Sequence, residues 1–218
     1  MLYGKIDLNK LIDNTTTVAY GVTVADLETD KQKEPRQLAQ SRIEMFAQNY
    51  RGWIFEYAEF LLSHPEKRRD SKYAVVAILN SCVDMIGKLH LEKEDRKCVK
   101  KRVFQGLKTI FIGIEAQPEW KNISETFYMQ FRNGVAHGGV VRGVYLADDA
   151  DEDKYGAIIP PLGWGRDPRD GKFTLVINVP AYFEVLRNHV ERYVHDILNA
   201  PDTDRRRQNF LEALSSIG

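Results

Sequence analysis

Three side chains between Arg132 and His137 could act together on a phosphate ester. Arg132, Asn133 and His137 supply a guanidinium, an amide and an imidazole within six residues. A guanidinium offers a planar set of donors that fits phosphate oxygens, and an imidazole titrates near neutral pH and can carry a proton. On a helix, Asn133 and His137 share a face because they are four residues apart. Arg132 lies on another face, but its length and the neighbouring Gly134 would let it reach back.

The same segment also has a purely structural interpretation. Arg and His are favourable in the last turn of a helix, where they meet the negative end of its dipole. The Gly138-Gly139 pair that follows is a common helix stop. Asp84 on an upstream helix could support Arg132, although a capping or surface role for that carboxylate is the simpler interpretation.

Two other stretches imitate ligand-binding motifs but fail on spacing. Residues 149–153 begin like a calcium loop, yet Lys154 occupies the sixth position, which needs Gly, and Pro160 the twelfth, which needs Glu. Residues 165–172 imitate a phosphate-binding loop with one intervening residue too many, and Phe173 stands where Ser or Thr should hold magnesium. We interpret the first stretch as a solvated acidic loop and expect no phosphate site in the second.

The remaining candidates predict neither a metal site nor a cofactor site. Cys82 and Cys98 fall in segments with helical periodicity and indicate buried thiols rather than a disulfide or a zinc site. The run Arg205–Arg207 is typical of a solvated helix face. Four further histidines show no ligand spacing: His64, His90, His189 and His195.

The composition predicts a globular chain without a broad basic surface. Hydrophobic residues make up 43% of the 218 residues and charged residues 28%, which is typical of one folded domain with its own core. Lys and Arg number 31, as do Asp and Glu, so any RNA binding must come from a local patch. No signal-peptide core and no apolar run of about 18 residues is present. We therefore expect a cytoplasmic protein that does not enter a membrane.

Helical periodicity dominates the chain and predicts a bundle. The first helix should present one aromatic-rich face to the core, and the second, apolar on two sides, should be central. The fourth should open with a capping box of Asn122 and Glu125. The predicted helices are 36–63 after Pro35, 72–90 capped by Asp70 or Ser71, 95–114, one from about 122 to Gly138, one from Asn178 to Asn199, and a short tail helix. The predicted inward face of the first is Ile43, Phe46, Tyr50, Trp53, Tyr57 and Phe60.

A change of period predicts a small β insertion. Residues 140–146 and 173–179 alternate apolar and polar positions, and we predict that they pair as a hairpin with a long loop and a tight turn at Asp170-Gly171. An exposed Trp164 in that loop would favour partner binding. The predicted organisation is a polar arm over 1–34, with one short strand or helical turn, and a helical domain over 35–218 with the β insertion at about 139–179.

The segment Arg132–Gly138 resembles the signature of HEPN-domain proteins. That signature has an Arg, a polar residue, three further residues and a His, followed here by Gly, near the end of a late helix of the bundle. The resemblance covers about residues 36–200, and its specific match is Arg132, Asn133 and His137. It implies a mainly α, HEPN-like antiparallel bundle that carries the small β-hairpin insertion, and it implies a homodimer.

The resemblance also implies an activity, a metal-independent endoribonuclease of the toxin or phage-defence type with no cofactor. His137 would transfer a proton at the 2′-hydroxyl or the leaving 5′-oxygen, Arg132 would stabilise the transition state, and Asn133 would hold a phosphate oxygen or orient the pair. RNA would be the substrate, and an antitoxin or other defence protein a possible partner. Gly139 replaces a Tyr that some members use for antitoxin regulation, so that regulation is not expected.

Two other functions remain open from the sequence. One is a non-catalytic HEPN-like module that binds a protein partner or a nucleotide. The other is a helical scaffold in which Arg132 and His137 only cap a helix.

Overall fold

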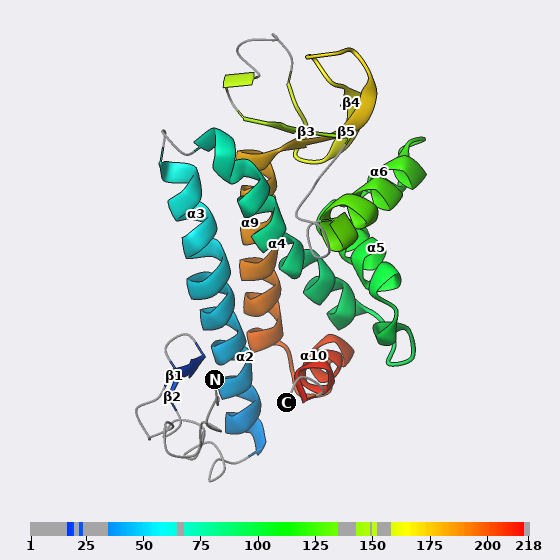
Figure 1. Cartoon of the computed structure of the whole chain (residues 1–218). Coiled ribbons are helices and arrows are strands. Elements are labelled where there is room, and N and C mark those ends of the chain that lie inside the picture. Colours follow the sequence, from blue (N-terminus) through cyan, green and yellow to red (C-terminus); the bar gives the residue numbers. More distant parts are fainter. Residues whose placement is uncertain are drawn as a thin grey trace, which may run out of the picture.

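The computed structural model describes residues 17–19, 22–23, 35–64, 68–134, 143–148, 150–151 and 158–215. They form a mainly helical molecule with a small three-stranded sheet at one end and α10 at the other (Figure 1). The helical elements are α2 (Pro35–Asn49), η2 (Tyr50–Phe55), α3 (Glu56–Ser63), α4 (Arg68–His90), η3 (Asp95–Lys97), α5 (Val99–Ile110), η4 (Ile114–Ala116), α6 (Trp120–Phe127), η5 (Tyr128–Gly134), α9 (Val179–Asn199) and α10 (Arg205–Ser215). The strands are β1 (Thr17–Ala19), β2 (Val22–Thr23), β3 (Val144–Ala147), β4 (Gly163–Arg166) and β5 (Phe173–Asn178).

The first helix runs without a break from α2 through η2 to α3, as the sequence predicts from Pro35 onward. Its middle is a π-helical turn, in which the Glu56 N–H donates to the Arg51 carbonyl five residues earlier. Such a turn inserts one extra residue and therefore rotates everything after it relative to an α-helix.

This π-turn splits the predicted inward face of the first helix. Before and within the turn, Ile43, Phe46 and Tyr50 are buried as predicted. At its end and beyond it, Phe55 and Ala58 are buried instead. The prediction is wrong for the three aromatic residues that continue the original spacing, because the extra residue turns them outward: Trp53 is 50% exposed, Tyr57 60% and Phe60 54%.

The helix α4 is central, as its two apolar stripes predict, and it contacts α3, α5, α9, α10 and η5. Its crossing with α5 depends on two glycines. A Cβ at Gly87 would lie 1.7 Å from the Arg102 carbonyl oxygen, and one at Gly106 would lie 1.9 Å from the Val83 carbonyl oxygen. The two backbones therefore touch, and no larger residue fits at either position.

Three predicted helix boundaries differ from the structure. The helix α4 begins at Arg68, so Ser71 lies inside it, and the Ser71 hydroxyl donates to the Leu61 carbonyl instead of capping. The predicted 95–114 helix is shorter, because 3₁₀ turns replace its ends. The helix α6 begins at Trp120 and has no side-chain cap, while Glu125 accepts a hydrogen bond from Lys100 at 2.7 Å, so the capping box is wrong.

The sheet has the order β3-β5-β4 and corrects the predicted hairpin. Both predicted strands exist and pair, but β3 and β5 run parallel. The hairpin partner of β5 is β4, which lies inside the predicted loop and pairs antiparallel. A turn does lie at Asp170-Gly171, where Gly171 has φ of 74°. It connects β4 to β5 over residues 167–172 and is therefore wider than the predicted tight turn: the Gly171 N–H donates to the Asp167 carbonyl, and the Asp167 N–H donates to the Lys172 carbonyl. In the predicted N-terminal arm, β1 and β2 form a separate antiparallel pair.

The last two helices begin as predicted and are joined by a buried arginine. The Asn178 side chain caps α9 by accepting from the Ala181 N–H at 3.2 Å, with Pro180 in the first turn. In α10, Arg207 is 3% exposed and donates to the Ile197 carbonyl at the end of α9. The prediction of a solvated face is therefore wrong for Arg207, which satisfies a helix terminus that would otherwise lack a donor.

Candidate functional site

The predicted site begins in η5, at the end of the helix that starts with α6. The backbones of Arg132 and Asn133 belong to this turn, while their side chains and the whole of His137 lie outside the described part of the structure. The predicted assembly of the three side chains therefore stays a prediction.

A series of buried aromatic and aliphatic side chains anchors η5 to the bundle. Ile123, Phe127 and Phe131 are at most 2% exposed, as their four-residue spacing predicts. The rings of Phe127 and Phe131 lie 5.3 Å apart, and Phe127 is 6.3 Å from the ring of Tyr182 on α9. The element also contacts α4 and α5. The residue before Arg132 is thus fixed in the core.

The turn that carries Arg132 and Asn133 is π-helical rather than α-helical. The prediction that Asn133 and His137 share a helix face assumes an α-helix. A π-turn has more residues in each turn, so that prediction does not carry over to it directly. Turns of this kind are uncommon and occur frequently at functional sites. The sequence offered no sign of this change, because Phe127 and Phe131 keep an α-helical spacing.

Asp84, which the sequence suggested as a support for Arg132, already forms an ion pair with Arg102. Both Asp84 oxygens accept from Arg102, Oδ1 from Nε at 2.9 Å and Oδ2 from an Nη at 3.0 Å. Arg102 also donates to the Arg96 carbonyl at 2.7 Å. This carboxylate joins α4 to α5, a role that the sequence did not identify.

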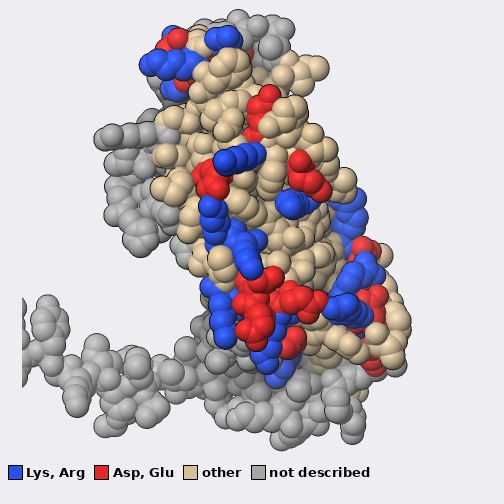
Figure 2. Space-filling model, turned by 90° about the vertical axis from the view of Figure 1, so that its right-hand side faces the viewer, with Lys and Arg blue, Asp and Glu red and all other residues tan. Residues whose placement is uncertain are grey.

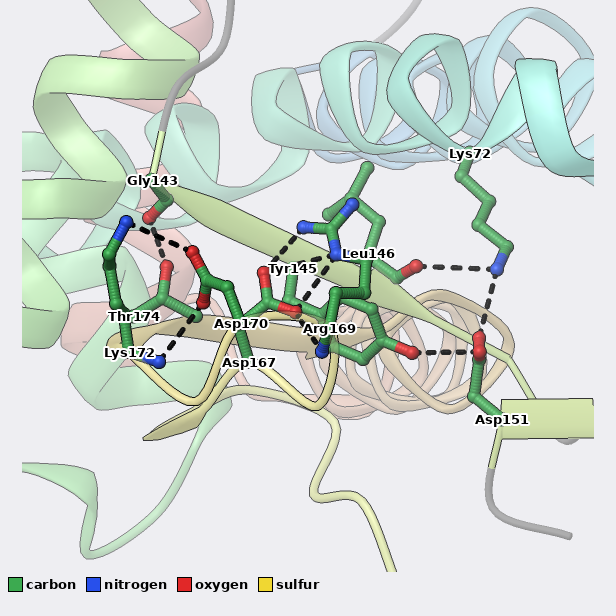
Figure 3. Close-up of polar contacts among 10 residues, drawn as sticks. All are labelled: Lys72, Gly143, Tyr145, Leu146, Asp151, Asp167, Arg169, Asp170, Lys172 and Thr174. Atoms are coloured by element: carbon green, nitrogen blue, oxygen red, sulfur yellow. Dashed lines mark hydrogen bonds and ion pairs between the residues drawn. The ribbon is translucent and has the colours of Figure 1, made fainter. Parts of the chain in front are cut away.

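A polar cluster that the sequence did not reveal lies where α4 meets the sheet (Figure 3). Lys72 is only 8% exposed, and its ammonium donates to the Leu146 carbonyl at 3.2 Å. It also pairs with Asp148 at 3.0 Å and with Asp151 at 3.2 Å. Its three partners come from β3 and the segment just after it, more than 70 residues away along the chain.

Tyr145 extends this cluster to the β4–β5 turn. Its hydroxyl donates to Asp151 at 2.7 Å, and the Arg169 guanidinium lies 4.9 Å from the centre of its ring. Arg169 in turn binds both oxygens of the buried Asp167. Burial opposes ionisation of Asp151, but hydrogen bonds from Tyr145, the Asp148 amide and Lys72 outweigh it and lower the pKa of this carboxyl. Each of the three carboxylates in the cluster has a hydrogen-bonded or ion-paired partner, and the contacts of Lys72 tie α4 to the sheet.

Two histidines lie near one tyrosine at the other end of the bundle. The ring of Tyr193 lies 5.4 Å from that of His90 on α4 and 6.5 Å from that of His189, one turn earlier on α9. Burial, then His90 and Arg192, lower the pKa of His189 to about 4. Its Nε2 is buried and has no hydrogen-bond partner in the described structure. The imidazole of His189 is therefore neutral at pH 7. Burial, followed by Arg206, also lowers the pKa of His90.

The cysteines are both free thiols. Cys82 is buried, as predicted, and burial raises its pKa, whereas Cys98 is exposed and contradicts the prediction. Among the residues that the structure describes, no three His, Cys, Asp or Glu side chains form a group that could hold a metal ion.

A groove of about 200 Å³ lies beside η2, between the first helix and α9. Four apolar residues line it together with Arg51 and Glu191: Ala47, Phe55, Val190 and Val194. The groove involves neither η5 nor the Lys72 cluster.

The face formed by α5 and α6 carries both signs of charge. Figure 2 shows Lys and Arg lying among Asp and Glu on this side, and the contacts explain why: Lys100 pairs with Glu125 at 2.7 Å and Lys101 with Asp95 at 2.5 Å.

Across the described ranges, every helix is too short or too polar to be a membrane span. Comparisons with protein families, curated proteins and solved structures give no match for this chain.

Proposed function

We propose that this chain is a metal-independent HEPN-type endoribonuclease, with the antiparallel bundle of that family and a toxin or phage-defence role. The observation that carries the proposal is the position of Arg132 and Asn133 on a π-turn, directly after the buried Phe131. A π-turn anchored in this way gives polar side chains a rigid base, which a catalytic site needs.

The proposed reaction is a transesterification within the RNA. The 2′-oxygen attacks the adjacent phosphorus as the bond from phosphorus to the 5′-oxygen breaks, leaving a 2′,3′-cyclic phosphate and a free 5′-hydroxyl. One His137 takes the proton of the 2′-hydroxyl, and a second imidazole gives a proton to the leaving oxygen. Arg132 balances the charge that grows on the phosphate oxygens, and Asn133 holds one of these oxygens or orients the pair.

The two imidazoles come from two copies of the chain in this proposal. A symmetric dimer that brings two copies of the segment together supplies one base and one acid from equivalent residues. As parts of the same proposal, we expect a cytoplasmic location, where RNA substrates occur, and control by an antitoxin or another defence protein.

Cleavage of RNA in the presence of EDTA tests the proposal. We expect His137→Ala and Arg132→Ala each to slow cleavage by about 100-fold or more, which is the usual contribution of such groups. The matched controls are His195→Ala and Arg205→Ala, whose side chains are about three-quarters exposed on other helices. A 2′,3′-cyclic phosphate at the cleaved end is also expected. Cleavage that survives in both site variants would contradict the assignment.

A non-catalytic interaction module is the second candidate. The aromatic residues that the first π-turn leaves exposed favour it. Trp164 does not, because it is partly buried and packs against the main core. A protein without nuclease activity in the EDTA assay, yet with specific binding at the α3 surface, would support this second function.

A further inference from the structure

The groove beside η2 presents two unlike charges together with apolar side chains, and we call it the η2 groove. Arg51 belongs to the first helix and Glu191 to α9, so each of the two helices that form the groove supplies one charge. Both charged residues are exposed, whereas Phe55, Val190 and Val194 are buried apart from the surface that they turn toward the groove. A concave, mostly apolar surface with a few polar groups is the usual form of a small-molecule site.

The two charges of the η2 groove are unpaired. In the part of the chain that the structure describes, neither the guanidinium of Arg51 nor the carboxylate of Glu191 has a hydrogen bond or an ion pair, either with the other or with a third residue. By contrast, Arg187, one turn before Glu191 on α9, pairs with Glu184 at 2.7 Å. Both charges of the groove are therefore available to a ligand.

The π-turn η2 gives the groove part of its lining. Two of the six lining residues, Arg51 and Phe55, belong to this turn, and Ala47 precedes Arg51 by four residues. The spacing that buries Tyr50 would place Trp53 on the inward side, but the extra residue of the π-turn brings Phe55 there instead. A local distortion of the helix thus places an aromatic ring beside an unpaired arginine. Turns of this kind occur frequently at functional sites.

The size and the charges of the η2 groove select its occupant. Its volume of about 200 Å³ is below the range of about 300–1,000 Å³ that holds drug-sized ligands, so the occupant is a small molecule. An anion would be attracted by Arg51 but repelled by Glu191, and a cation would meet the reverse. A molecule that carries one charge of each sign and an apolar part matches all the groups that line the groove.

We propose that the η2 groove binds a free α-amino acid with an aliphatic side chain. The carboxylate of the ligand accepts hydrogen bonds from Arg51, whose planar fork of donors fits a carboxylate. Its ammonium donates to Glu191, and its side chain covers Val190 and Val194, which removes apolar surface from water. This inference concerns a different surface from the proposed nuclease site and holds whether or not the chain cleaves RNA.

Isothermal titration of the full chain with L-leucine tests the proposal. Two derivatives keep the same side chain: L-leucinamide lacks the carboxylate, and N-acetyl-L-leucine lacks the ammonium. They also represent the two ends of a peptide, so they distinguish a free amino acid from a chain terminus. We expect L-leucine to bind, and each derivative to bind at least about tenfold more weakly, because each loses a charge-assisted hydrogen bond. Arg51→Gln and Glu191→Gln should each weaken the binding of L-leucine by a similar factor.

The matched controls are Glu44→Gln and Arg192→Gln, which change exposed residues of the same two helices that do not line the groove. Both should bind L-leucine as the unchanged chain does. All four variants should keep their thermal midpoints, because the replaced side chains are exposed. Absence of L-leucine binding, equal binding of either derivative, or undiminished binding in Arg51→Gln and Glu191→Gln would overturn the proposal. So would an equal loss of binding in the two controls.

Discussion

The partly buried imidazole of His189 makes folding sensitive to mild acid. Its pKa is lowered to about 4 by burial, by His90 and by Arg192, whereas an unfolded histidine titrates near pH 6.5. The unfolded chain therefore takes up a proton first as the pH falls. Stability is complete above about pH 6.5 and declines down to about pH 4, by at most about 1.4 kcal/mol per pH unit for this group.

Urea unfolding at pH 7.5 and pH 5 measures this effect. Because the side chain is partly exposed, solvent reduces the full value, and we expect a loss nearer to 1 kcal/mol in total. His189→Phe keeps a ring beside Tyr193 and should reduce the difference between the two pH values, with the remainder due to His90. The exposed His195 offers the control, and His195→Phe should leave the difference unchanged. An undiminished difference in His189→Phe would show that other groups cause it.

The single ammonium of Lys72 is shared by two carboxylates that are mostly buried. The side chains of Asp148 and Asp151 are 13% and 21% exposed, and each pairs with the same lysine. Lys72→Met leaves both negative charges without their cation, so we expect unfolding to become about 2–3 kcal/mol easier, somewhat below the usual loss for a fully buried pair. Chemical denaturation at pH 7 gives the value directly.

A second lysine of the same region provides the control for this substitution. Lys172 pairs with Asp170 at 3.2 Å, but its side chain is 81% exposed. Lys172→Met should therefore change stability by no more than about 1 kcal/mol. Equal effects of the two substitutions would mean that the cluster of Lys72 adds nothing beyond a surface pair.

At the scale of elements, periodicity predicted the helices better than it predicted their faces. Every predicted helix exists, and α6 and α9 bury the residues that their spacing indicates, as α4 does except at the partly buried Ile78 and Met85. The first helix fails after Tyr50, because one extra residue in the backbone changes the phase of everything beyond it. The aromatic residues keep a spacing of three and four on both sides of Tyr50. Because this spacing is the one that an unbroken α-helix would show, the sequence carries no sign of the π-turn.

The sheet shows a similar limit. Alternation identified β3 and β5 but could not choose between parallel and antiparallel pairing. The antiparallel hairpin partner of β5 is β4, and the sequence did not reveal β4 because it contains two glycines and has no alternating pattern. The Lys72 cluster was missed for a related reason: its members are polar residues far apart in the sequence, which only the packing of α4 against β3 brings together.

The crossing of α4 and α5 predicts a strong effect of one added methyl group. A Cβ at Gly106 would lie 1.9 Å from the Val83 carbonyl oxygen, which is backbone and cannot move aside alone. Alanine favours a helix by about 1 kcal/mol over glycine, but forcing the helices apart should outweigh this. We expect Gly106→Ala to lose at least about 2 kcal/mol of stability, at the upper end of the usual overpacking range.

Ser81→Ala on the exposed side of α4 is the control, and thermal melting compares the two. That variant should stay within about 0.5 kcal/mol of the unchanged chain. A stable Gly106→Ala protein would mean that the helices can separate without loss, which contradicts a crossing fixed by backbone contact.

At the scale of the molecule, the sequence predicts where Arg132 and Asn133 lie along the fold but not how the candidate site is assembled. The position of Arg132 and Asn133 at the end of a bundle helix follows from Ile123, Phe127 and Phe131. Periodicity does not describe where the side chain of Arg132 points. It also does not describe the interface at which two copies of the chain would bring their His137 residues together. The EDTA assay and its variants are therefore the measurements that decide the function.

The predicted division at residue 34 leads to a comparison of two truncations. The buried core of the described chain extends from Ile43 to Ala213 and is closed by α10, where Phe210 packs against Phe46 with ring centres 5.0 Å apart. Removal of residues 1–34 spares this core, so we expect the thermal midpoint to shift by less than about 2 °C, which corresponds to about 0.5 kcal/mol for a domain of this size. Removal of residues 205–218 exposes Phe46 and the end of α9, takes away Arg207, and should prevent cooperative melting, since loss of one buried Phe alone costs about 3–5 kcal/mol. A fall of about 4 °C or more after the first truncation would contradict a division at that residue and would make the N-terminal arm part of the domain.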